Sequence, residues 1–211
     1  MSSTIEVKIC GLTNLDDVLG ALDAGADYLG FVMYDRSPRG ITASETARIL
    51  ERLDVPVKAV GVFVNETRAN MEKIASDCGL HAVQVHGDER AADFAEMPVM
   101  LWRSVRLDAP GVDTALDEWG AERLVVDASV PGMYGGTGVA ADWVAAAQLA
   151  AKRPVMLAGG LTTGNVAESV RMVKPLGVDT ASGVEREPGK KDLEKVREFV
   201  RKAKGEGGSR G

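Results

Sequence analysis

The stretch IEVKICGLTNLDDVLGALDAG (residues 5–25) has the pattern of a strand followed directly by a helix. Apolar and charged residues alternate over 6–10, which is typical of a β-strand. Apolar residues then recur at helical spacing from Leu15 to Leu22, with Asn14 placed to cap the helix start and Gly25 placed to end it. These residues predict one β/α unit at the amino end of the chain.

The same pattern recurs along the chain. Strand-like runs occur at 6–10, 28–32, 57–63, 82–85, 99–104, 123–127, 155–158 and 178–180. Helix-like segments follow at 43–52, 66–78, 89–96, 112–118, 141–151 and 163–173, and a last helix runs through Leu193, Val196, Phe199 and Val200. Eight strands, each followed by a helix after a short connection, favour a single-domain α/β fold, the parallel (β/α)₈ TIM barrel, with an open doubly wound sheet as the alternative. We expect 1–204 to form this one domain and 205–211, which lack apolar residues, to form a disordered tail.

Composition limits the partners of the protein. The chain has 25 basic and 31 acidic residues, a net charge of −6, and only 5% aromatic residues, so nucleic acid is not an expected partner. No apolar run is long enough for a membrane span, and residues 1–4 lack the basic start of an export signal. Two cysteines cannot form a disulfide framework or a metal motif. We therefore expect a cytoplasmic protein that captures any anionic substrate through a local site.

Cys10 is a candidate catalytic residue because it stands at the carboxyl end of the first strand, where active sites of (β/α)₈ barrels are built. A thiol accepts a proton near neutral pH only if its thiolate is stabilised. Lys8, two residues earlier on the same strand face, is either that stabilising cation or a member of a structural ion pair. The alternative for Cys10 itself is that it fills the core as a small apolar residue.

Asp127 ends the apolar run LVVD of the sixth strand, so it reaches the same end of the barrel. Partial burial there favours a protonated carboxyl, which a general acid requires. A loop cap or a salt-bridge partner is the alternative for Asp127.

Glycine-rich loops at 135–138, 158–161 and 179–185 predict a phosphate site, because glycines let backbone N–H groups approach an anion and the loops after strands 7 and 8 bind phosphate recurrently in this fold. Arg39, in SPR (37–39) after the second strand, offers a planar fork for a carboxylate. His86 follows the fourth strand and is expected near the barrel mouth, whereas His81 precedes that strand and is expected at the opposite face. We expect no metal site.

These stretches together resemble the phosphoribosylanthranilate isomerase family of tryptophan biosynthesis. The matching motifs are KICG (8–11), SPR (37–39), GVFVN (61–65), QVHG (84–87), VVD (125–127), GGTG (135–138), LAGGL (157–161) and DTASGVE (179–185). They run in the order of the family from the first strand to the last.

The resemblance implies an Amadori rearrangement of N-(5-phosphoribosyl)anthranilate without a cofactor, in a monomer or a homodimer. By the resemblance, Cys10 is the general base and Asp127 the general acid. Arg39 matches the residue that holds the anthranilate carboxylate. The other positions expected to contact the substrate are Gln84, His86 and Gly136 in matched motifs, and Gly159, Gly160, Ser182 and Gly183 in the phosphate grip.

Two positions depart from the family pattern: Ala141 stands where a phenylalanine is common, and the tail after Ala203 is rich in glycine. A ribulose-phosphate epimerase is an alternative of the same fold, but its metal-binding histidines and aspartates are missing. A non-catalytic sugar-phosphate binding protein does not require both Cys10 and Asp127. A second activity on the aminoaldose of histidine synthesis stays open.

Overall fold

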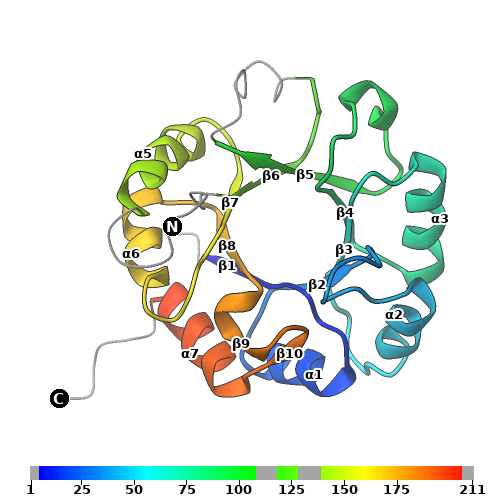
Figure 1. Ribbon diagram of the computed structural model, residues 1–211, viewed down its shortest axis with the longest axis horizontal. Helices are drawn as coiled ribbons and strands as arrows, with labels where there is room; N and C mark the ends of the chain where they lie inside the picture. Colours follow the sequence, from blue (N-terminus) through cyan, green and yellow to red (C-terminus); the bar gives the residue numbers. More distant parts are fainter. Residues whose placement is uncertain (1–4, 108–117, 128–138, 206–211) are drawn as a thin grey trace.

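The chain forms a closed barrel of eight parallel strands in the computed structural model, which describes residues 5–107, 118–127 and 139–205 (Figure 1). The strands are β1 (Glu6–Ile9), β2 (Tyr28–Val32), β3 (Ala59–Phe63), β4 (Ala82–Val85), β5 (Met100–Arg106), β6 (Arg123–Asp127), β7 (Val155–Ala158) and β8 (Gly177–Thr180). Each strand pairs with the next in the sequence, and β8 pairs with β1 to close the barrel. The predicted (β/α)₈ barrel is confirmed, and the open sheet is wrong.

Helices surround the barrel on its outer side (Figure 1). They are α1 (Leu15–Asp23), α2 (Ala43–Leu50), α3 (Arg68–Cys78), α5 (Val139–Ala150), α6 (Val166–Val173) and α7 (Leu193–Ala203), with the short 3₁₀ helices η1 (Ala91–Phe94) and η2 (Ser182–Val184). The helix predicted at 112–118 lies outside the described residues except for Glu118, which is in a turn, and the tail expected at 205–211 lies outside them except for Gly205. Across the described ranges, no helix is long and apolar enough to cross a membrane.

Two local features differ from the sequence prediction. The helix expected at 89–96 is only the 3₁₀ turn η1, because Phe94 is its one large apolar side chain and Glu96, two residues before Pro98, takes a left-handed φ of 55°. After β8 the chain forms a two-stranded antiparallel sheet of β9 (Glu185–Glu187) and β10 (Lys190–Lys191), which was not predicted. The Pro188-Gly189 pair between these strands is a turn signal in the sequence.

The first β/α unit forms as its sequence predicts. Asn14 caps α1, since its side chain accepts a hydrogen bond of 2.9 Å from the backbone N–H of Asp17. The chain leaves α1 through Gly25, whose φ of 85° is open to glycine at little cost. This short exit returns the chain to β2 beside β1.

Large side chains fill the barrel interior near the amino ends of the strands. Trp102 and Tyr28 are buried there, with their ring centroids 4.9 Å apart in an edge-to-face arrangement. The guanidinium of Arg123 lies 5.0 Å from the Tyr28 ring centroid and pairs with Glu6. His81 is also at this end, 5.9 Å from the Tyr28 ring, as predicted. Because this end is closed, the opposite end is left for a binding site.

Candidate active site

A cavity of about 330 Å³ opens at the carboxyl ends of the strands. Seven of the predicted site residues line it: Cys10, Arg39, Gln84, His86, Gly159, Gly160 and Ser182. The remaining lining is contributed by Val32, Tyr34, Ser37, Val62, Val64, Ala158, Leu161, Asp179, Thr180 and Ala181. The cavity thus combines an apolar wall from β2 and β3 with polar groups from β1, β4 and β8, a composition suited to an aromatic ring that carries charged substituents.

Cys10 follows β1 directly, and its backbone N–H donates a 2.8 Å hydrogen bond to the carbonyl of Thr180 on β8. The neighbouring strand makes room for the thiol because it has a glycine there. A Cβ added to Gly30 would lie only 2.9 Å from Sγ of Cys10. The thiol is therefore held between β8 and β2 and borders the cavity.

Lys8 lies in the barrel interior and is completely buried. Its Nζ contacts Oδ1 of Asp179 at 3.1 Å. Burial of the ammonium lowers the pKa of Lys8, but the Asp179 carboxylate and Cys10 outweigh this effect, so the pKa lies above its ordinary value. Burial raises the pKa of the Cys10 thiol, while Lys8 opposes that rise and Asp179 adds to it. Lys8 accordingly fills both roles considered for it, as an ion-pair partner and as a cation that favours the thiolate.

Gln84 and His86 reach the cavity from β4. Nε2 of Gln84 donates a 2.8 Å hydrogen bond to Oγ of Ser104, which orients the amide. Within the described part of the chain, the buried Oε1 of Gln84 has no hydrogen-bond partner, so it is available to a ligand. Burial, together with Lys8, lowers the pKa of His86, which is therefore a neutral imidazole at neutral pH.

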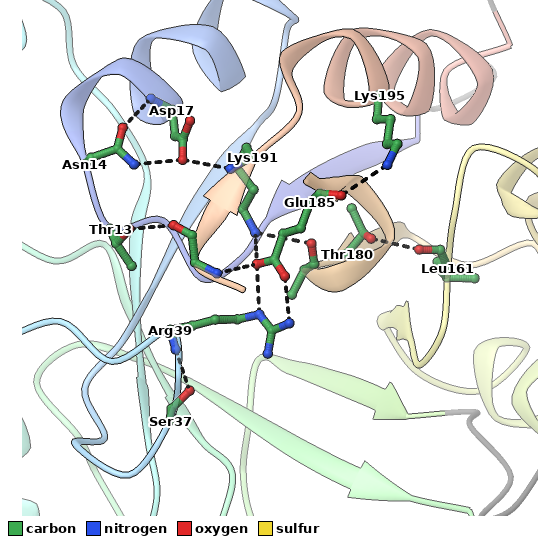
Figure 2. Close-up of polar contacts among 12 residues, drawn as sticks. Thr13, Asn14, Asp17, Ser37, Arg39, Leu161, Thr180, Glu185, Lys191 and Lys195 are labelled. Carbon is green, nitrogen blue, oxygen red and sulfur yellow. Dashed lines mark hydrogen bonds and ion pairs between the residues drawn. The ribbon is translucent and has the colours of Figure 1, made fainter. Parts of the chain in front are cut away.

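Arg39 borders the cavity from the loop after β2, and Figure 2 shows its guanidinium facing Glu185. Nε and Nη2 of Arg39 donate to the two carboxylate oxygens of Glu185 at 2.8 and 2.7 Å. Lys191 is buried and its Nζ donates to the same carboxylate at 2.9 Å. These two cations hold the pKa of Glu185 below its ordinary value despite burial, so the carboxylate stays charged.

Asp127 ends β6 and is half-buried, but it is not among the residues that line the cavity. Its strand neighbour Ala158 does line the cavity, and the carboxylate of Asp127 is close enough to His86 to act on the pKa of that imidazole. Gly183 also lies outside the lining. It packs against the loop after β7, since an added Cβ would lie 1.9 Å from the carbonyl oxygen of Leu161. Gly136 lies outside the described residues.

Sequence reasoning did not single out Ser104, Asp179, Glu185 or Lys191. Asp179 and Glu185 stand inside the DTASGVE stretch, where only the serine and glycine were assigned a role. Lys191 and Glu185 belong to the unpredicted hairpin, so no sequence signal placed them beside Arg39. Ser104 lies in the predicted strand at 99–104, and no motif singled it out.

Comparison with known proteins gives one consistent result. Residues 7–202 match the protein family described as N-(5'phosphoribosyl)anthranilate (PRA) isomerase. An N-(5'-phosphoribosyl)anthranilate isomerase of Pelobacter propionicus is 44% identical over 200 residues, covering 95% of this chain and 96% of the relative.

The fold agrees equally well with solved structures. The crystal structure of a phosphoribosyl anthranilate isomerase from Thermotoga maritima has a TM-score of 0.86 and 36% identity, covering 95% of this chain and 99% of that chain. A second phosphoribosyl anthranilate isomerase structure, in complex with reduced 1-(o-carboxyphenylamino)-1-deoxyribulose 5-phosphate, has a TM-score of 0.83 and 34% identity over the same shares of the two chains.

Proposed function

The chain belongs to the N-(5'-phosphoribosyl)anthranilate isomerase family, and from this premise we propose that its cavity carries out the Amadori rearrangement of that substrate with Asp127 as acid and Cys10 as base. The product is 1-(2-carboxyphenylamino)-1-deoxyribulose 5-phosphate, and the step serves tryptophan biosynthesis. The observation that carries the proposal is the position of Cys10, whose thiol borders one cavity together with Arg39 and the glycines after β7.

Asp127 performs the first step in this proposal. Its carboxyl donates a proton to the ring oxygen of the ribose, the bond between that oxygen and C1' breaks, and the nitrogen lone pair forms a Schiff base with C1'. His86 is close enough to Asp127 for the charge of that carboxylate to affect its pKa. Because the imidazole is neutral, it does not add a second positive charge beside the cationic Schiff base. Its uncharged state therefore favours ring opening.

Cys10 performs the second step as a base. The thiolate removes the proton from C2', and the electrons of that C–H bond form an enolamine with C1', which neutralises the Schiff base. The enolamine then tautomerises to the ketone at C2'. Cys10 acts on a carbon-bound proton and not as a nucleophile, so no covalent intermediate forms.

The remaining predicted residues bind the two ends of the substrate. We assign the phosphate to the backbone around Gly159 and Gly160 after β7 and around Ser182 and Gly183 after β8, where two glycine-containing loops come together. The anthranilate carboxylate is assigned to Arg39, and the unpaired Oε1 of Gln84 accepts a hydrogen bond from a sugar hydroxyl.

The wider setting follows from the same family. A small-molecule substrate is the partner, and we propose the cytoplasm as the compartment, in keeping with two free cysteines, both buried. Monomer and homodimer both remain compatible with this proposal.

The test is the loss of substrate fluorescence after freshly generated phosphoribosylanthranilate is added to the purified protein. We expect turnover in the parent protein and a decrease in kcat of at least about 100-fold in Cys10→Ser and in Asp127→Asn, the usual contribution of a general acid or base. Cys78→Ser is the matched control, because Cys78 is buried at the end of α3 and its thiol donates to the carbonyl of Ala43, as a hydroxyl can.

The outcomes separate the assignments. Absence of turnover in the parent protein contradicts the enzyme function, and binding without turnover favours a sugar-phosphate binding protein. Turnover near the parent level in Cys10→Ser or in Asp127→Asn removes the role assigned to that residue alone.

A further inference from the structure

We propose that Glu185 is a positioning residue that aims the guanidinium of Arg39 and thereby sets the preference of the site for substrates with a carboxylate on the aromatic ring. The inference rests on the proposed function and assigns a role to the β9–β10 hairpin. Glu185 itself does not line the cavity, whereas Arg39 does.

The guanidinium of Arg39 is held on two sides. Glu185 binds Nε and Nη2 in a bidentate arrangement at 2.8 and 2.7 Å, which fixes the plane of the fork. On the other side, the stem of Arg39 packs against Gly11, where an added Cβ would lie 2.7 Å from Cδ. Gly11 also has a φ of 72°, so a larger residue is unfavourable there for both reasons. Arg39 is therefore oriented before any substrate binds.

One nitrogen of the fork is left for a ligand. Nη1 of Arg39 has no acceptor among the residues that the structure describes, and Figure 2 shows it pointing away from Glu185. The side chain of Arg39 is 23% exposed and borders the cavity, whereas that of Glu185 is only 5% exposed. This geometry allows the free edge of the guanidinium to bind a carboxylate inside the cavity.

Glu185 is itself held rigidly. Lys191 donates to Oε1 of Glu185 at 2.9 Å, and the backbone N–H of Gly189 donates to the same oxygen at 3.2 Å. The hairpin is anchored to the loop after β1, because Oγ1 of Thr13 donates to the carbonyl of Gly189, and to α1, because the backbone N–H of Lys191 donates to the carboxylate of Asp17 (Figure 2). Arg39 from the loop after β2 and the hairpin after β8 thus meet at this carboxylate.

The charges of this cluster favour an incoming anion. One carboxylate, Glu185, faces two cations, Arg39 and Lys191, so the cluster has an excess positive charge at the edge of the cavity. A substrate carboxylate on Nη1 would balance it. If Glu185 is neutralised, Arg39 loses its fixed plane and is free to adopt other rotamers, which weakens a directional contact more than a diffuse attraction.

The experiment compares two substrates in wild type and Glu185→Gln: phosphoribosylanthranilate and N-(5-phosphoribosyl)aniline, which lacks the ring carboxylate. We expect Glu185→Gln to lower kcat/KM for the first substrate roughly 10- to 100-fold, mainly through KM, and to change the second by less than about 3-fold, since only a charged contact is weakened. Arg39→Ala should produce the same loss of discrimination.

Lys191→Met is the matched control, since it removes the other cation of Glu185 while leaving the contact with Arg39 in place. It should reduce the discrimination between the two substrates less than Glu185→Gln does, because the bidentate contact that fixes the plane of the Arg39 guanidinium is still present. If Glu185→Gln folds poorly, as judged by circular dichroism, the double variant Glu185→Gln/Lys191→Met removes one charge of each sign and should show the same loss of discrimination. Equal losses on both substrates in the Glu185 variants would overturn the positioning role, whereas absence of turnover in wild type would overturn the proposed function instead.

Discussion

Replacing Lys8 by Met should lower the fraction of Cys10 that is present as thiolate, the form that can act as a base, without touching the substrate site directly. Lys8 is completely buried, pairs with Asp179 at 3.1 Å and opposes the rise in the pKa of Cys10 that burial causes. Removing its ammonium takes away the strongest charge that favours the thiolate and leaves the Asp179 carboxylate opposed only by the weaker effect of Lys191. We therefore expect a higher pKa for Cys10 and a smaller thiolate population at a given pH. Asp179→Asn should act in the opposite direction, because it removes the like charge and leaves Lys8 to the thiolate.

The size of the effect follows from Coulomb's law. Two unit charges about 5 Å apart at an effective dielectric constant of about 20 interact by about 3 kcal/mol, roughly a 100-fold change in an equilibrium constant. Structural relaxation reduces this value, so we expect a decrease of about 10- to 100-fold in the thiolate population of Lys8→Met. The substitution also leaves a buried carboxylate unpaired, which costs about 3–5 kcal/mol of unfolding free energy. The double variant Lys8→Met/Asp179→Asn removes both charges and should recover much of that loss.

The assay is the rate at which iodoacetamide alkylates Cys10, because the thiolate is the reactive form. A Cys78→Ser background leaves Cys10 as the only thiol of the chain. At pH values below the pKa of the thiol, the rate should rank Asp179→Asn above the parent and Lys8→Met below it, with urea unfolding used to confirm that each variant is folded. An unchanged rate in Lys8→Met, or a shift of the two single variants in the same direction, would refute the electrostatic role of Lys8.

Three further predictions concern the base, the space around it and the closed end of the barrel. Because burial raises the pKa of Cys10 and the base must be deprotonated, kcat/KM should increase with pH through a midpoint above the ordinary cysteine value, and a plateau already reached at neutral pH would contradict this. Gly30→Ala should displace the thiol, with which its Cβ would clash, and lower kcat at least about 10-fold while the circular dichroism spectrum stays the same; full activity would show that the thiol can move freely. Trp102→Ala should lower the free energy of unfolding in urea by about 3–5 kcal/mol, whereas Trp102→Phe should lower it much less. No described residue accepts a hydrogen bond from Nε1 of Trp102, so the loss of that donor leaves no partner unpaired. Equal losses in the two variants would contradict the reasoning.

The barrel could be predicted from sequence because its units are local. The alternation at 6–10, the helical spacing after Asn14 and the glycine exit at Gly25 are properties of short segments, and all of them appear in the structure as expected. The helix at 89–96 was wrong because residues of high helix propensity cannot sustain a helix with one apolar side chain to bury. The β9–β10 hairpin was missed because its strands are short and charged, and only the Pro188-Gly189 turn marked it.

The candidate site was predicted in part for a related reason. Strand ends of a parallel barrel converge at one face, so Cys10, Gln84 and His86 could be brought to a common cavity from their positions alone. The charges that surround these residues could not be predicted from the sequence. Lys8 and Asp179, for example, are 171 residues apart in the sequence and pair only because β1 closes the barrel against β8.

By itself the sequence determined the alternation of strands and helices, the family motifs and the identity of the residues at the strand ends, because each of these depends on neighbours along the chain. The tertiary structure decided which long-range pairs set the chemistry of those residues. The Lys8–Asp179 pair beneath the thiol and the Glu185 carboxylate that orients Arg39 exist only because barrel closure and the hairpin bring distant segments into contact. Burial and charge then follow from that contact, and no local pattern encodes them.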